Sequence, residues 1–119
     1  MTTTTRVIPT QAHAVLDYVT GGALVAAPRL LGLTGTTAGK VLGLAGGIAT
    51  AQSLMTDYEL GLVKVIPMRT HLTLDALSGA MVAASPWIFG FANNGRRYWL
   101  PHVIVGANEI MAAALTKTR

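Results

Sequence analysis

The sequence predicts an all-α protein, a membrane four-helix bundle made of two parallel helix-pair repeats. Two observations favour this fold class. First, 51% of the 119 residues are hydrophobic and only 12% are charged, which is about half of the charged share of an average soluble domain. Second, residues 13–32 and 71–90 carry the same special residues in one register, and an internal repeat of this kind decides the architecture.

The repeat is visible as five pairs of residues at one constant spacing. The pairs are His13 and His71, Asp17 and Asp75, Gly21 and Gly79, Pro28 and Pro86, and Gly32 and Gly90. Each copy is followed by a second apolar stretch, over residues 38–56 and 98–116. The repeating unit is therefore a pair of helices. Because each unit holds an even number of helices, both copies run in the same direction, as parallel repeats do.

The chain divides into four segments on this basis. We expect an N-terminal tail at 1–9, repeat 1 at 10–56, an interfacial linker at 57–69 and repeat 2 at 70–116. The helices are expected near 10–32, 37–56, 70–91 and 97–116. Thr36 or Thr37 is a suitable N-cap for the second helix, and Asn93-Asn94-Gly95 predicts a tight turn before the fourth.

The hydropathy pattern favours helices that cross a membrane. Residues 76–95 carry no charge, which meets the length of about 20 residues that a bilayer requires. The other segments are less apolar, but none shows the broad polar face of a soluble amphipathic helix. A cleavable signal peptide is not expected, because His13 and Asp17 interrupt the first apolar run.

The second repeat also carries a family motif. Ser85-Pro86-Trp87, followed by Ile-Phe-Gly-Phe, resembles the signature of the SPW-repeat family of small prokaryotic integral membrane proteins. The first repeat departs from the motif, since it reads Ala27-Pro28-Arg29. The resemblance covers about residues 10–116. It implies four transmembrane helices and a multi-pass protein of the prokaryotic inner (cell) membrane, but it implies no molecular activity.

The membrane topology follows from the even number of helices. Both termini are expected on one side of the membrane, with the loops 33–37 and 92–97 on the other. Five basic residues lie on the side of the termini and four on the opposite side. This small excess predicts cytoplasmic termini under the positive-inside rule.

Aromatic residues gather where the third helix is expected to end and the fourth to begin. We interpret them as anchors at the level of the lipid headgroups, where such side chains are enriched; an aromatic ligand platform is the alternative. These residues are Trp87, Phe89, Phe91, Tyr98 and Trp99.

Polar residues within the helices are the main lead to a function, because ionisable groups are costly inside a membrane. At about 1.5 Å per residue, several of them fall at one depth, and His102 lies toward the opposite side. The predicted buried polar layer consists of His13, Asp17, Thr50, His71, Asp75 and Glu109. The favoured interpretation is that the His–Asp pairs hold helices together. A proton or cation site, a His-ligated transition metal, and a haem or quinone site are the alternatives.

The second helix also carries small residues at four-residue spacing, Gly39, Gly43 and Gly47. Such a stripe lets two backbones approach closely, either within the bundle or in a homo-oligomer. The expected partner of the chain is the lipid bilayer. Nucleic acid is not expected, because the basic residues are scattered rather than clustered.

The sequence therefore predicts a structural or accessory membrane component. The alternative is a proton- or cation-binding or conducting element that uses the His/Asp/Glu layer. No catalytic motif is present, so we predict no enzyme activity and no catalytic residue. We also predict no cofactor and no bound metal.

Overall fold

The computed structural model describes residues 6–118 and consists of helices. It contains α1 (Thr10–Leu30), α2 (Thr37–Leu54), α3 (Met68–Ile88), the short 3-10 helix η2 (Phe91–Asn94) and α4 (Arg96–Leu115). No β-strand occurs over this range. The predicted all-α four-helix bundle is therefore confirmed.

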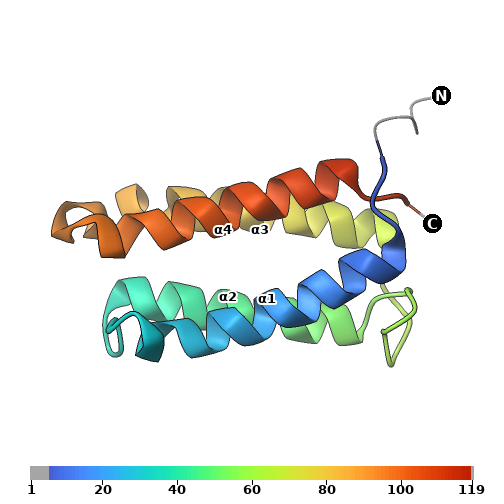
Figure 1. The fold of residues 1–119 in the computed structure, drawn as a ribbon, viewed down its shortest axis with the longest axis horizontal. Coiled ribbons are helices and arrows are strands. Elements are labelled where there is room, and N and C mark those ends of the chain that lie inside the picture. The colour runs from blue at the N-terminus through green and yellow to red at the C-terminus, as the bar shows by residue number, and fades with distance from the viewer. Residues whose placement is uncertain (1–5, 119) are drawn as a thin grey trace.

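The helices form two pairs that lie side by side (Figure 1). One pair is α1 with α2 and the other is α3 with α4. Both ends of the described chain lie at one end of the bundle, together with the linker between α2 and α3. The α1–α2 and α3–α4 turns lie at the opposite end.

Corresponding residues delimit α1 and α3. Pro9 and Pro67 occupy the N-cap positions with extended backbone, since proline has no N–H to leave unsatisfied in the first turn. Soon after the helices end, Gly32 and Gly90 adopt positive φ angles of 68° and 79°, which only glycine takes up readily. The predicted helix 70–91 was thus placed too late at both ends, since the chain turns before Gly90.

The α2 helix begins as expected. The hydroxyl of Thr36 accepts a hydrogen bond from the backbone N–H of Gly39 at 3.0 Å. The same hydroxyl donates to the carbonyl of Leu33. Thr36 is therefore the N-cap, one of the two residues predicted for this role.

Two glycine pairs, one in each helix pair, allow the helices to pack closely. A Cβ atom on Gly46 would lie 2.7 Å from the carbonyl oxygen of Gly21 in α1. A Cβ atom on Gly106 of α4 would collide with the carbonyl oxygen of Gly79 in α3. These contacts bring backbone against backbone, as small residues do between membrane helices.

The predicted glycine stripe of α2 is not where the helices meet most closely. Gly39 packs against Leu33 of the α1–α2 turn, and Gly43 makes only an ordinary contact with Pro28. A Cβ on Gly47 would meet nothing within 4 Å. The close contact with α1 is made by Gly46, the residue before Gly47. The face of α2 that packs against α1 is therefore not the face that carries the stripe.

The chain ends close the bundle in a matched way. The segment before α1 pairs with the end of α4, through a parallel bridge between Ile8 and Thr116. The segment before α3 pairs with the end of α2, through a parallel bridge between Thr56 and Ile66. Thr56 and Thr116 are therefore fixed in corresponding positions beside the first turns of α3 and α1.

The predicted membrane spans were not found in individual helices. Within residues 6–118, none of the helices combines the length and the apolar character needed to cross a bilayer.

Candidate functional site

A cluster of four ionisable side chains lies between the two helix pairs. α1 contributes His13 and Asp17, and α3 contributes His71 and Asp75. In each helix the two residues are four positions apart, so that they share one face. Both histidines are about 1% exposed, and Asp75 is 9% exposed. The cluster is thus inside the bundle, near the starts of α1 and α3 and so near the end that holds the linker.

The Nε2 atoms of the two histidines point to the same place, between the two carboxylates. His13 Nε2 lies 3.1 Å from Asp17 Oδ1 and 3.0 Å from Asp75 Oδ2. His71 Nε2 lies 2.9 Å from Asp17 Oδ2 and 3.1 Å from Asp75 Oδ2. One ligand atom from each of the four residues can be chosen so that all lie within 4.8 Å of one another. Each histidine therefore contacts a carboxylate of its own helix and one of the other helix pair.

The opposite nitrogen of each ring contacts a threonine hydroxyl. His13 Nδ1 lies 2.6 Å from Thr116 Oγ1, and His71 Nδ1 lies 2.6 Å from Thr56 Oγ1. Each hydroxyl also donates to the carbonyl four residues earlier, of Ala112 or of Gln52. Because a hydroxyl has only one proton to donate, it must accept from the ring. Both Nδ1 atoms therefore carry a proton.

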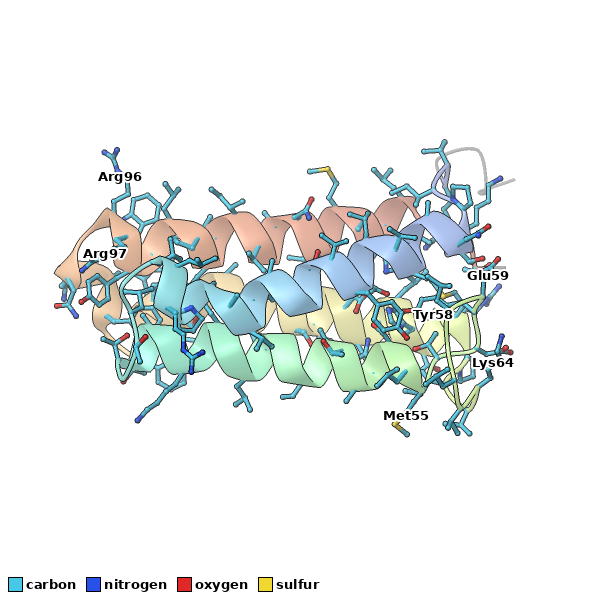
Figure 2. The ribbon with its side chains drawn as sticks, turned by 60° about the horizontal axis from the view of Figure 1, so that its bottom comes forward. Met55, Tyr58, Glu59, Lys64, Arg96 and Arg97 are labelled. Atoms are coloured by element: carbon cyan, nitrogen blue, oxygen red, sulfur yellow. The ribbon has the colours of Figure 1, made fainter. Side chains whose placement is uncertain are left out.

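Two further side chains hold the carboxylates from outside. The amide of Gln52 in α2 donates to Asp75 Oδ1 at 3.0 Å, and the hydroxyl of Tyr58 donates to Asp17 Oδ2 at 2.8 Å. Tyr58 belongs to the linker (Figure 2). It is 4% exposed. Burial raises the pKa of Tyr58, and the negative charge of the nearby Asp17 carboxylate raises it further. The phenol therefore stays protonated and keeps donating.

No sequence pattern pointed to Gln52 or Tyr58. Gln52 lies between apolar and small residues of α2, and Tyr58 lies in a segment predicted to be an interfacial linker. Only the folding of this linker back over the bundle end brings Tyr58 to α1. Thr56 and Thr116 could not be predicted as partners of the histidines either, because threonine is common at helix ends.

The two other members of the predicted polar layer, Thr50 and Glu109, are not part of the cluster. Thr50 donates to the carbonyl of Gly46 in its own helix and contacts Gly21, so it serves helix packing. Glu109 shares with Asp17 and Asp75 the wall of a cavity of about 20 Å³, which is room for about one water molecule. One oxygen of Glu109, Oε2, is buried without a protein hydrogen-bond partner.

The predicted aromatic group is divided by the structure. Trp87 and Phe89 are exposed, and Tyr98 and Trp99 are half-buried. The rings of Trp87 and Trp99 lie 6.1 Å apart. Phe91 was misplaced in this group, since it is only 4% exposed and packs in the core against His102. It turns inward because η2 follows directly after Gly90.

His102 lies apart from the cluster, as its position in the sequence indicated. It is fully buried in α4 and its Nε2 lies 2.9 Å from the carbonyl oxygen of Ala38 in α2. This contact connects the two helix pairs near the end with the turns. His102 therefore joins the two helix pairs at one end of the bundle, as the cluster does at the other end.

The hydrogen-bond pattern limits the chemistry of the cluster. With Nδ1 protonated, each Nε2 either carries a second proton or offers its lone pair. Two imidazolium rings facing two carboxylates would form a neutral group, and so would two neutral rings and two carboxylates around a divalent cation. Both arrangements avoid the high cost of a buried net charge.

The chain matches a known protein family over nearly its whole length. The SPW repeat domain matches residues 11–116. The chain belongs to the SPW repeat family. No curated protein and no solved structure matches it. Membership in the SPW repeat family agrees with the Ser85-Pro86-Trp87 motif, in which Pro86 is buried near the end of α3 and Trp87 is exposed.

Proposed function

We propose that this SPW repeat protein is a small structural or accessory component of a membrane, in which a buried His–Asp cluster holds two helix pairs together. The observation that carries the proposal is a polar centre enclosed by an apolar outer surface. A soluble bundle has the reverse arrangement at its surface, with charged side chains along the outer faces of its helices.

The outer surface supports the membrane location. Each of the four helices exposes large apolar side chains along its middle. They include Val15, Val19 and Val25 of α1, Leu44 and Ile48 of α2, Leu77 and Met81 of α3, and Ile104 and Met111 of α4. Large exposed apolar side chains on all four helices favour contact with lipid or with another protein over contact with water.

The charged side chains support the same location. Outside the cluster and Glu109, the charged residues of the described chain lie within a few residues of a helix end or in the linker. Figure 2 shows Arg96 and Arg97 at one end of the bundle, and Glu59 and Lys64 at the other. The α1 and α3 helices have 21 residues each, or about 30 Å, which is close to the hydrocarbon thickness of a bilayer.

The low hydropathy of the individual helices is compatible with this proposal. An average over a whole helix counts the inward side chains, such as His71 and Asp75, together with the outward ones. Lipid contacts only the outward face once the helices have assembled, and the inward polar groups satisfy one another. The Ser85-Pro86-Trp87 motif adds support, because its resemblance to the family signature implies an integral membrane protein. A multi-pass arrangement in the inner membrane, with cytoplasmic termini, remains part of the proposal.

The test is membrane extraction of the full chain. Membranes from cells that express the tagged protein are washed with alkaline carbonate and then treated with detergent. We expect the protein to resist the wash and to dissolve only in detergent. Release by carbonate alone would contradict the proposed location.

Cation binding is a second candidate function. It is favoured by one observation, the convergence of both Nε2 atoms and both carboxylates on one point. A double variant Asp17→Asn and Asp75→Asn separates the two functions, because Asn keeps hydrogen-bonding capacity but loses the charge. A structural role predicts loss of stability alone, whereas cation binding predicts that uptake of the cation is lost as well.

A further inference from the structure

We propose that His13, Asp17, His71 and Asp75 bind a divalent first-row transition-metal ion that joins the two helix pairs. This inference deepens the proposed function, because it names a ligand for the same cluster. It rests on the geometry of the four side chains, on the hydrogen bonds of their outer atoms and on an unpartnered nitrogen inside the cluster.

The set of ligand atoms fits a transition metal. Two imidazole nitrogens and two carboxylate oxygens are available, and imidazole favours zinc, iron, copper or nickel over calcium and magnesium. In a tetrahedral site with bonds of about 2.0–2.2 Å, the ligand atoms lie roughly 3.3–3.6 Å apart. With one oxygen from each carboxylate, three N–O distances of 2.9–3.1 Å would have to open by a few tenths of an ångström. The four ligand atoms lie within 4.8 Å of one another, so the wider separations would have to close toward the ion.

The threonines supply what a metal-binding histidine needs. Such a histidine donates its other ring N–H to an acceptor, which fixes the ring and leaves the second nitrogen free to bind. Thr116 and Thr56 accept from the Nδ1 atoms of His13 and His71. Both rings are thereby held with Nε2 directed toward the carboxylates.

The carboxylates are oriented in the same manner. Gln52 donates to Asp75 Oδ1, and Tyr58 donates to Asp17 Oδ2. Ligating carboxylates are commonly held by such outer hydrogen bonds. One donor comes from the first helix pair and the other from the linker, so the outer contacts also depend on the assembled bundle.

An independent observation points to a ligand within the cluster. His71 is about 1% exposed, yet its Nε2 makes no hydrogen bond with suitable geometry. It lies near two carboxylate oxygens without aiming an N–H at either of them. A buried nitrogen without a partner costs free energy, and coordination of a cation by its lone pair would remove this cost.

The charge balance also fits. Two neutral imidazoles and two carboxylates carry two negative charges, which a divalent ion neutralises. The small cavity beside Asp17 and Asp75 gives room for about one water molecule, which could complete the coordination of an ion that prefers more than four ligands.

The test uses the purified full chain in detergent, stripped of metal with a chelator and titrated with Co²⁺. We expect about one ion per chain, because the four ligands form one site, and the visible absorption of low-symmetry Co²⁺. Zn²⁺ should displace Co²⁺ and abolish the bands. Absence of the bands, with no metal retained after gel filtration, would overturn the proposal.

Variants assign the site. His71→Asn should abolish the Co²⁺ bands, and Thr56→Val should weaken binding by about 10–100-fold, as loss of an outer contact does. His102→Gln is the matched control, because it replaces another buried histidine without touching the cluster, and it should bind like the parent. Unchanged binding by both cluster variants would overturn the assignment.

Folding of each variant is checked by circular dichroism. If His71→Asn does not fold, Thr56→Val and the spectrum of the parent protein still decide the question. A negative result in the metal test does not change the result of the carbonate extraction. The metal site and the membrane location are therefore tested separately.

Discussion

The imidazole of His13 donates through Nδ1 to the hydroxyl of Thr116, 103 positions further along the chain, at 2.6 Å. His71 and Thr56 make the corresponding contact at the same distance. In both cases the threonine lies just beyond the end of α4 or α2. It fixes a histidine near the start of α1 or α3, the first helix of the other pair. The cluster and the closure of the bundle are therefore parts of one structure.

The first prediction concerns these threonines. Replacing Thr116 with Val keeps the shape of the side chain but leaves the buried N–H of His13 without an acceptor. We expect a loss of about 1–3 kcal/mol in the free energy of unfolding, the usual cost of such a group. Denaturation in detergent, followed by circular dichroism, measures the change.

Thr73→Val provides the control. The hydroxyl of Thr73 makes the same bond to the carbonyl four residues earlier, but the residue is exposed. Its replacement should change stability by less than about 0.5 kcal/mol, as surface substitutions do. Equal effects at Thr116 and Thr73 would mean that the bond to His13 contributes nothing.

The second prediction concerns the charge of the cluster. Asp75→Asn removes a carboxylate that contacts both histidines. Removing one partner of a buried ion pair costs about 3–5 kcal/mol. We expect the free energy of unfolding to fall by this order in the same denaturation experiment. Asp57→Asn, at an exposed position of the linker, is the matched control and should be close to neutral.

The third prediction concerns the close contact of α3 and α4. Gly106→Ala places a methyl group against the backbone of Gly79 and Ala83, which cannot move aside without separating the helices. We expect destabilisation of about 1–3 kcal/mol, the usual cost of overpacking. Gly47→Ala faces open space and should be neutral or slightly stabilising. If the two variants melt at the same temperature, the two helices do not need this contact.

The fourth prediction concerns the outer surface. Met81 is 67% exposed in the middle part of α3, and Leu62 is 78% exposed in the linker. If lipid surrounds the bundle, Met81→Arg places a charge in hydrocarbon, at a cost of about 2.5–3.5 kcal/mol, and should reduce the amount of protein in the membrane fraction. Leu62→Arg lies at the end of the bundle and should be tolerated. Equal amounts of both variants in washed membranes would argue against lipid around α3.

Much of the fold was predictable because it depends on local patterns. Prolines and glycines at matching positions delimit α1 and α3, and the apolar stretches between them predict the four helices. The boundaries were less accurate. The predicted end of the third helix was three residues too late, because the positive φ of Gly90 stops the helix and redirects Phe91 into the core.

The site was predictable only in part. Spacing by four residues placed His13 with Asp17, and His71 with Asp75, on one face of each helix. Thr50 and Glu109 were assigned to the same layer by depth alone, and depth does not say which way a side chain points. Thr50 therefore serves the packing of α1 on α2, while Glu109 borders a cavity next to the cluster.

The sequence by itself determined the helical class, the repeated special residues and the helix faces that carry the ionisable groups, because these follow from periodicity and from the backbone chemistry of proline and glycine. The tertiary structure decided which atoms meet. Contacts such as His13 with Thr116 and Tyr58 with Asp17 join positions 103 and 41 residues apart. No local pattern encodes such pairs, since they form only when the linker folds over the bundle end and the last turn of α4 returns to the start of α1.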